Sequence, residues 1–287
     1  MEGGDERAVI DITKGYTRDQ LVFHAHVHFI PKDEVVKGYG HMIGVSEFVV
    51  REYEKACKIP VDTHVLRNAI DVDKFNKTIS DEERNRLRKK LGLQEDDFVV
   101  LYVGRLISFK GILELMRSVL EVNDKHVKLL CIGSANFGKW AFSSYEGRIK
   151  KLAEQNKDRI IFAGYVNNAE VYKYASVADV QCVPTLVEEA AGLVLMEAMA
   201  EGLPLIVTRS GGVMEYADES AALIIERENI VENLKSAICY LKDHLEVRKK
   251  MSANAKIQSE KYDEAIYYQN FVTIVNEIMD KNPCVLG

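Results

Sequence analysis

Short apolar runs alternate with amphipathic stretches along the chain from about residue 98 onward. A polar or amphipathic segment follows each of the runs FVVLYV, VKLLCI, RIIFAG, VADVQCV, LPLIVT and AALII. This alternation is typical of β-α-β units, which form a parallel sheet covered by helices. The intervening helices are expected at 112–122, 145–156, 168–175, 192–201 and 230–243. The pattern therefore predicts a complete doubly wound, Rossmann-like domain.

The first 78 residues have a thinner pattern of elements. They contain only three strand candidates, VIDI, LVFHAHVHF and HMIGV, and one helix at 46–57 that begins at Ser46. So few elements predict a reduced α/β lobe rather than a second domain of equal size.

Two helices flank the Rossmann-like domain. Ser80 and Glu83 have the spacing of a capping box and Gly92 ends the helix, so 80–91 is expected to be a surface helix between lobes. The tail at 264–280 is amphipathic and must pack on another part of the protein. The expected organisation is a reduced N-terminal lobe, a Rossmann-like domain and a C-terminal helix, at 1–78, 79–262 and 263–287.

Composition excludes several classes of protein. The net charge of -6 lacks the basic excess that binding to a nucleic-acid backbone requires. Five widely spaced cysteines, an odd number without a C-x-x-C pair, indicate reduced thiols in a cytoplasmic protein. No apolar run reaches the roughly 18 residues of a membrane span, and the first residues lack the apolar core of a signal peptide.

The stretch LVFHAHVHF places histidines at 24, 26 and 28. On a strand these side chains share one face, and neutral imidazoles bind zinc; an H-x-H pair on an early strand also opens the metal site of amidohydrolase-type barrels. A zinc site needs ligands from elsewhere, yet the histidines at 41, 64, 126 and 244 are expected to stand singly, without a carboxylate or cysteine at ligand spacing. The alternative is a strand that ends in a cleft, with one functional histidine and two ordinary ones.

Two glutamates lie within the segment EEAAGLVLMEAMAEGLPLIVTRSGGVMEY. The turn-like sequence between them predicts that Glu189 lies in a loop and that Glu197 lies on the following helix, among apolar neighbours. An unpaired buried carboxylate costs several kcal/mol, so Glu197 needs a partner, a cleft or an exposed position. The two hydroxyls of a ribose would suit its oxygens. Taken alone, an exposed helix residue is the simpler interpretation.

The segment VGRLISFKG lies between a predicted strand and a predicted helix. Gly104 permits a sharp exit from the strand, and Arg105 and Lys110 then project from the loop that leads into the helix. This arrangement suits a diphosphate, because arginine offers paired donors, lysine adds a mobile charge and the helix dipole favours anions. The order of residues is not that of a Walker A loop. Two cations after a strand are also common on a solvated rim.

Together, four phrases resemble glycosyltransferase family 4 of the GT-B enzymes. They are VGRLISFKG, PTLVEEAAGLVLMEAMAEGLPLIVTRSGGVMEY, FAGYVNNAEVYKYASVADVQCVP and GVSEFVVREYEKACKIPVDTHVLRNAIDVDKF. The resemblance covers roughly residues 20–280. It implies a GT-B fold, in which the C-terminal Rossmann-like domain binds the sugar donor, the N-terminal lobe binds the acceptor and the last helix returns to that lobe. Two positions depart mildly from the family: Asn68-Ala69 replaces asparagine-glycine and Pro184-Thr185 replaces proline-serine.

The resemblance also implies roles for individual residues. Glu189 and His26 are the expected catalytic residues, which approach the donor sugar from the two lobes. The other expected positions bind the nucleotide-sugar: Gly104, Arg105 and Lys110 at the diphosphate, Gly192 and Leu193 through amides at a helix start, Glu197 at the ribose and Val166, with the backbone from Gly164, at the base.

The implied reaction uses no metal and no cofactor besides the donor substrate. The family is expected to transfer a hexosyl group with retention of configuration, from a UDP-sugar on family frequency, to a glycan, a lipid-linked glycan or a small acceptor. The resemblance removes the zinc interpretation of the histidines. The sequence DVD at 71–73 is like the metal-binding D-x-D of another glycosyltransferase fold, but here it belongs to the interlobe phrase NAIDVDKF.

The family pattern breaks at the N-terminus. Family members have an acceptor lobe more than twice as long as residues 1–78, and it opens with a glycine-rich loop that is missing here. The chain is then a fragment, a reduced member, or a donor-binding subunit that is inactive until a partner supplies the rest. We expect self-association or a protein partner at residues 1–45, and a cytoplasmic location that can include the membrane surface.

Overall fold

The larger part of the protein is a six-stranded parallel sheet covered by helices. The structure is a computed structural model that describes residues 11, 14–27, 32–134 and 144–281. The strand order is β6-β5-β4-β7-β8-β9, with β4 (Phe98–Val103), β5 (Val127–Ile132), β6 (Ile160–Gly164), β7 (Val180–Val183), β8 (Leu205–Thr208) and β9 (Ala222–Ile225). All six predicted strands are confirmed. The order reverses between β4 and β7, where doubly wound sheets bind ligands at their carboxyl ends.

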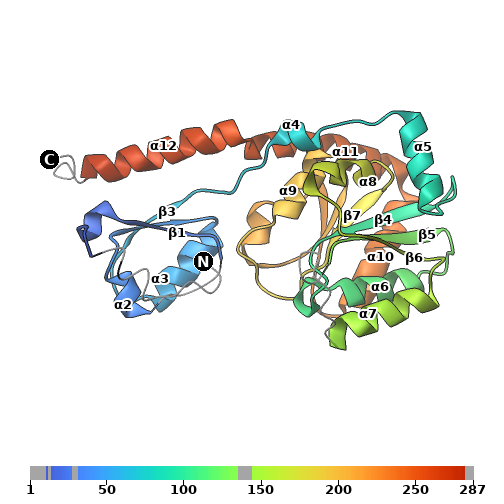
Figure 1. Cartoon of the computed structure of the whole chain (residues 1–287), viewed down its shortest axis with the longest axis horizontal. Coiled ribbons are helices and arrows are strands. Elements are labelled where there is room, and N and C mark those ends of the chain that lie inside the picture. Colours follow the sequence, from blue (N-terminus) through green and yellow to red (C-terminus); the bar gives the residue numbers. More distant parts are fainter. Residues whose placement is uncertain (1–10, 12–13, 28–31, 135–143, 282–287) are drawn as a thin grey trace.

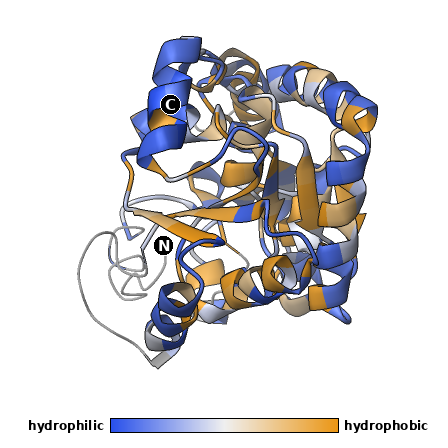
Figure 2. Ribbon diagram, turned by 90° about the vertical axis from the view of Figure 1, so that its right-hand side faces the viewer, coloured by the Kyte–Doolittle hydropathy of each residue, from blue (hydrophilic) through white to orange (hydrophobic). Residues whose placement is uncertain are grey.

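Each face of this sheet carries its own hydrophobic cluster. In β4, Val99 and Leu101 belong to one cluster while Val100 and Tyr102 belong to the other, so both faces are buried. The covering helices are α6 (Ile112–Glu121), α7 (Ser144–Gln155), α8 (Val171–Ala175), α9 (Leu193–Ala200), α10 (Ile230–Asp243) and α11 (Leu245–Ser259). Figure 2 shows the hydrophobic strands inside and hydrophilic outer surfaces on the helices.

One of these helices was not predicted. The buried residues of α11 are Met251, Ala255 and Ser259, spaced four apart, and two of them are too small or too polar to produce an apolar period. The other five helices appear where they were expected, although α8 is shortened because residues Asn168–Glu170 form a 3-10 turn before it.

The N-terminal lobe contains a separate three-stranded parallel sheet. Its order is β1 (Val22–Ala25), β2 (His41–Gly44) and β3 (Asp62–Val65), and it packs with α2 (Asp33–Val36) and α3 (Glu47–Ala56). Ser46 caps α3 as predicted, because its hydroxyl accepts a hydrogen bond from the Val49 amide at 3.2 Å.

The expectations for these strands need two corrections. The strand predicted over LVFHAHVHF is too long. Strand β1 pairs with β2 only as far as Ala25 and Gly44, so His26 follows the strand. The third strand, β3, was missed because its sequence, DTHV, lacks an apolar run. His28 and all of VIDI except Asp11 lie outside the described residues.

The chain crosses between the lobes twice, and the two crossings lie side by side. The first leads into α4 (Val72–Phe75) and α5 (Asp81–Lys90), whose capping box of Ser80 and Glu83 is present as predicted. The second leads into α12 (Glu264–Lys281), and the Ile70 amide of the first crossing donates to the Tyr262 carbonyl at 2.9 Å.

Helix α12 runs from the large domain along the small lobe (Figure 1). Its Ile274 and Ile278 are buried in one cluster with Ile43 and Leu66 of the small lobe. Among the described helices, none combines the length and apolar composition needed to cross a bilayer.

Candidate active site

Three glycines bring the carboxyl ends of β4, β5 and β6 close together. The Gly104 amide donates to the Ile132 carbonyl at 3.0 Å, and the Gly133 amide donates to the Gly164 carbonyl at 2.9 Å. Gly133 has φ +138°, and a Cβ atom there would lie 1.9 Å from the Gly104 carbonyl oxygen. Only glycine fits this position, so the strand ends form a flat edge on which a ligand can approach the backbone.

The loop after β4 packs against the loop after β7. Gly111 adopts a left-handed conformation with φ +70°, and a Cβ atom there would lie 1.9 Å from the Pro184 carbonyl oxygen. The Leu186 amide donates to the Phe109 carbonyl at 2.8 Å. The fold therefore joins the two segments that the sequence singled out, VGRLISFKG and PTLVEEAAG.

Arg105 and Lys110 differ in their partners. The Arg105 carbonyl accepts a hydrogen bond from the Tyr102 hydroxyl at 2.7 Å, and its guanidinium lies 5.7 Å from the centre of the Phe109 ring. In the described part of the chain, the Arg105 guanidinium has no carboxylate partner. Lys110 Nζ instead lies 2.7 Å from both carboxylate oxygens of Glu189. The guanidinium can therefore accept an anion directly, whereas the lysine must share its charge with Glu189.

Glu189 lies in the loop before α9, as predicted, and hydrogen bonds hold both its side chain and its backbone. Thr185 Oγ1 donates to its Oε1 at 2.5 Å, and the Glu189 amide donates to Ser210 Oγ at 3.1 Å. The side chains of Glu189 and Lys110 are 16% and 26% exposed. A largely buried carboxylate that is paired and hydrogen-bonded is a fixed negative charge at the edge of the sheet.

Gly192 and Leu193 form the start of α9. Gly192 is the N-cap and offers no side-chain hydrogen bond to the helix. The amides of Leu193 and Val194, in the first turn of the helix, have no acceptor within it. Leu193 is 48% exposed. This helix start can thus offer amides and a partial positive charge to an anion.

Glu197 is connected to the interlobe segment through Asn168. Asn168 Nδ2 donates to Glu197 Oε1 at 3.0 Å, while Lys74 Nζ donates to Asn168 Oδ1 at 2.6 Å. Burial raises the pKa of Glu197, and Asn168 and Lys74 oppose this shift. The simpler interpretation of Glu197 as an exposed helix residue is therefore wrong. The spacing of motifs did not identify Asn168 and Lys74, although both lie in phrases that resemble the family.

Val166 and the interlobe aspartates complete the edge of the site. Val166 follows β6 and packs against the core cluster that contains Val99, and Gly164 before it has φ +76°. Asp71 of the DVD sequence is the N-cap of α4, because its Oδ1 accepts from the Lys74 amide at 3.0 Å.

His26 follows the end of β1 on the small lobe, and its side chain is exposed. Its ring lies 4.1 Å, centre to centre, from that of His24. Burial, and then the charge of His26, lower the pKa of His24 to about 4, so His24 is neutral at physiological pH. Within the described residues, no hydrogen bond or ion pair connects His26 with Glu189 or Arg105. Neither histidine belongs to a group of three metal-ligating side chains in that part of the chain.

The loop after β8 fastens the small lobe next to Glu189. The Gly212 amide donates to the Glu189 carbonyl at 2.8 Å, and a Cβ atom on Gly212 would lie 2.6 Å from Ser46 Oγ. The Glu215 carboxylate accepts from the amides of Glu47 and Phe48 at 2.9 and 2.8 Å, at the start of α3. Sequence reasoning missed this contact; the only signal was the glycine pair in TRSGGVMEY.

The buried carboxylate of Glu201, one turn after Glu197, is expected to make the stability of the protein depend on pH. Both of its carboxylate oxygens are buried without a hydrogen-bond partner among the described residues. Burial and the charge of Glu197 raise its pKa from 4.5 to about 8. Between these values the folded protein keeps a proton that the unfolded chain releases, so stability falls as pH rises through this window.

We therefore expect Glu201→Gln to raise the melting temperature by several degrees at pH 8.5 and to change it little at pH 4.5. Differential scanning calorimetry at both values measures the effect, with the exposed Glu246→Gln as the control. An equal shift at both pH values would contradict a protonated Glu201.

Two parallel α/β lobes joined by a double crossing, with the predicted donor residues on the larger one, define the class of GT-B proteins. The chain belongs to the family of glycosyl transferases group 1, whose model matches residues 83–258. This match includes every predicted site residue except His26.

Two curated relatives illustrate the family. The chain is 35% identical over 202 residues to an uncharacterized glycosyltransferase of Methanocaldococcus jannaschii, which covers 70% of this chain and 49% of the relative. It is 26% identical over 237 residues to the alpha-monoglucosyldiacylglycerol synthase of Acholeplasma laidlawii, covering 80% of this chain and 57% of that enzyme. The chain thus spans about half the length of these relatives.

The fold is also that of solved proteins. HepE of Anabaena, crystallised in complex with UDP, superposes with a TM-score of 0.82 at 20% sequence identity, over 95% of this chain and 77% of HepE. At this identity the likeness supports the GT-B fold alone.

Proposed function

We propose that the chain is a retaining, metal-independent hexosyltransferase of glycosyltransferase family 4. It would transfer a sugar from a UDP-sugar to a glycan, a lipid-linked glycan or a small acceptor. The observation that carries the proposal is the Lys110–Glu189 pair, held at 2.7 Å between a glycine-lined strand edge and an uncapped helix start.

In this proposal the donor diphosphate lies between Arg105, Lys110 and the amides at the start of α9. When the bond between the anomeric carbon and the diphosphate oxygen breaks, negative charge develops on the leaving group. These fixed donors stabilise that charge, which is the role of a metal ion in other enzymes. The acceptor hydroxyl forms the new bond to the anomeric carbon and passes its proton to the departing diphosphate oxygen, on which the negative charge develops.

The remaining residues position the donor. The Glu197 carboxylate has one oxygen bonded to Asn168, which orients the other toward a ribose hydroxyl. Backbone from Gly164 to Val166 contacts the base. Glu189 binds the sugar hydroxyls through a carboxylate that Lys110 and Thr185 hold in place, and His26 approaches the same sugar from the small lobe.

A donor-binding subunit without activity of its own is the second candidate. It is favoured by the coverage of only about half of the curated relatives, because the uncovered half would supply much of an acceptor lobe. In either case we place the protein in the cytoplasm. The name of the Acholeplasma relative, a synthase of monoglucosyldiacylglycerol, supports a location at the membrane surface when the acceptor is a lipid.

A thermal-shift screen with UDP-, GDP-, ADP- and TDP-sugars tests the donor assignment. A ligand at 100 times its Kd should stabilise the protein by about 2.7 kcal/mol, and we expect this shift with UDP-sugars. A shift with a different nucleotide-sugar would change the assignment of the base. The absence of a shift with all four would contradict donor binding. The anomeric configuration of the product, measured by NMR, tests retention.

Chelation should leave the donor site unaffected. We expect the Kd for UDP and any turnover to change less than twofold with excess EDTA, because the charges at the diphosphate are Arg105, Lys110 and helix amides. Isothermal titration with UDP, repeated with manganese or magnesium, measures this. A strict requirement for either cation would contradict the metal-independent mechanism.

A further inference from the structure

Two histidines and an aspartate meet on the small sheet, outside the proposed donor site. His41 and Asp62 are the first residues of β2 and β3 and are register partners, while His64 is two residues farther along β3. All three side chains therefore lie on one face. They lie at the amino ends of the strands, whereas Val45, at the opposite end of β2, contacts the donor domain through the Tyr216 hydroxyl.

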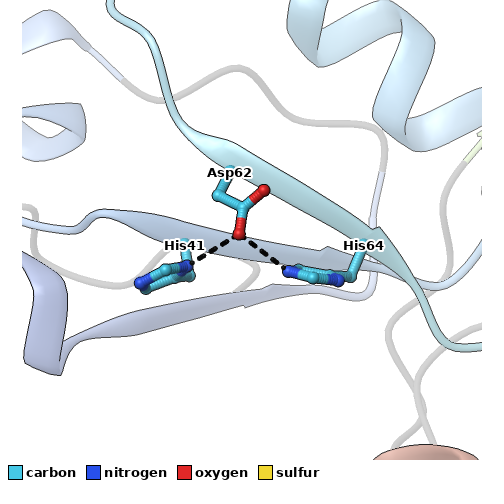
Figure 3. Close-up of side chains that lie close together, drawn as sticks. All are labelled: His41, Asp62 and His64. Carbon is cyan, nitrogen blue, oxygen red and sulfur yellow. Dashed lines mark hydrogen bonds and ion pairs between the residues drawn. The ribbon is translucent and has the colours of Figure 1, made fainter. Parts of the chain in front are cut away.

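The ligand atoms of this cluster point toward one another (Figure 3). Asp62 Oδ2 lies 3.3 Å from His41 Nδ1 and 3.2 Å from His64 Nε2. In a tetrahedral zinc site, metal–ligand bonds of about 2.0–2.2 Å place neighbouring ligand atoms about 3.3–3.5 Å apart. The two separations, 3.3 and 3.2 Å, are close to those edges. The three ligand atoms lie within 4.8 Å of one another.

The expectation that these histidines stand singly is therefore wrong. Asp62 precedes His64 by two residues, and the strand pairing brings His41 to the same carboxylate. The spacing D-x-H was visible in the sequence, but its meaning depended on β3, which was not predicted. The side chains of His41, His64 and Asp62 are 5%, 10% and 35% exposed, so only the aspartate side is open to solvent.

Helix α12 provides a second layer around the cluster. Glu277 Oε2 lies 3.9 Å from His64 Nδ1, the ring nitrogen that faces away from Asp62. This separation is longer than a hydrogen bond. Histidines that bind metals commonly donate this second N–H to a carboxylate, so zinc binding is expected to draw Glu277 closer to His64. Lys281 Nζ lies 3.3 and 3.0 Å from the two Asp62 oxygens and is 58% exposed. Lys281 is closer to Oδ2, so a cation bound there would displace the ammonium group from Oδ2 and leave its contact with Oδ1.

We propose that His41 Nδ1, Asp62 Oδ2 and His64 Nε2 bind one divalent zinc ion, with water as the fourth ligand. A donor set of two imidazole nitrogens and one carboxylate favours Zn²⁺ over Mg²⁺ and Ca²⁺, which prefer oxygen ligands. The ion would fasten β2 and β3 together and, through Glu277, hold α12 on the small sheet. Among the described residues, four are buried in the cluster beneath α12, namely Ile43, Leu66, Ile274 and Ile278, with Tyr267 partly buried against them. This contact is small, so a metal would add to its stability.

A second cluster in the chain provides a matched control. His126 Nδ1 lies 3.2 Å from Asp96 Oδ2 and 3.3 Å from Asp97 Oδ1, at distances close to those of the proposed site. This cluster has one imidazole instead of two, and Asp96 is 71% exposed. The other Asp97 oxygen accepts from the Gln94 amide at 2.7 Å. We expect no tight zinc binding there.

The test is calorimetric titration of the tag-free, metal-stripped chain with zinc chloride, together with the visible absorption of a cobalt(II) complex. The expected result is one equivalent bound with micromolar or tighter affinity and a cobalt spectrum typical of tetrahedral coordination. His64→Gln and Asp62→Asn should each weaken binding by about 100-fold or more, Glu277→Gln by about 10-fold, and His126→Gln should have no effect.

Thermal unfolding distinguishes this site from the donor site. Zinc should raise the melting temperature of the wild type and of His126→Gln but not of His64→Gln, while the Kd for UDP stays the same in all three. If His64→Gln fails to fold without metal, the exposed Glu277→Gln carries the test. Zinc affinity equal in the wild type and the cluster variants, or the absence of micromolar binding, would overturn the proposal.

Discussion

Replacing Arg105 with alanine should weaken donor binding by about 1.5–3 kcal/mol, roughly 10- to 150-fold in Kd, with the fold intact. Arg105 has no carboxylate partner among the described side chains, so its removal leaves no buried charge unpaired. Arg105→Lys should recover only part of the affinity, because lysine lacks paired donors. Isothermal titration with UDP and calorimetric unfolding measure the two effects separately.

Replacing Lys110 with alanine should weaken donor binding by a similar 1.5–3 kcal/mol but should also destabilise the free protein. Lys110 Nζ is the only cation paired with Glu189 in the described structure, at 2.7 Å, and its loss leaves that carboxylate unpaired. Adding Glu189→Gln to Lys110→Ala should restore the melting temperature without restoring donor affinity.

Arg209→Ala is the control for both variants. Arg209, which follows β8, has the same charge as Arg105, but its guanidinium is 54% exposed and pairs with Glu226, after β9, at 2.7 Å. Its loss should leave the Kd for UDP unchanged. If donor affinity is unchanged in Arg105→Ala and Lys110→Ala as well, the diphosphate assignment is wrong.

The larger domain could be predicted from the sequence because its strands are buried on both faces. In β4, five of six residues are buried, so a continuous apolar run marks the strand without ambiguity. The small lobe lacks such runs. None of the four residues of β3 is fully buried, and its Asp62 and His64 contact Lys281 and Glu277 of α12. Polar residues whose positions are set by tertiary contacts do not recur with a regular period, so the sequence pattern does not reveal such a strand.

The site was predictable where its residues are close in sequence and unpredictable where they are distant. Arg105 and Lys110 share one loop, and Glu189 lies in another short segment of recognisable composition. By contrast, Glu197 reaches Lys74 only through Asn168, a connection among three segments that depends on how the crossing packs on the domain. Sequence spacing contains no information about such a contact.

The free edge of the small sheet underlies the last prediction. The carbonyls of Leu21 and Ala25 accept from the amides of His41 and Val45 in β2, so the backbone groups of Val22 and His24 point the other way. Strand β1 has no partner on that side among the described residues. Open parallel edges with apolar side chains are sites of association, and Val22 is 43% exposed.

We therefore expect the isolated chain to bind donor, to associate through residues 1–45, and to transfer sugar at least about 100-fold more slowly than a chain extended by a full acceptor lobe, because a reduced lobe would hold the acceptor in line less well. Light scattering at high concentration measures association, and a coupled UDP-release assay measures the rate of transfer. Val22→Lys should reduce association, since charge on an edge strand opposes pairing, whereas Leu245→Lys, at a 50% exposed residue of the larger domain, should not. A monomer with ordinary transfer rates to a simple acceptor would contradict both halves and favour a complete, compact enzyme.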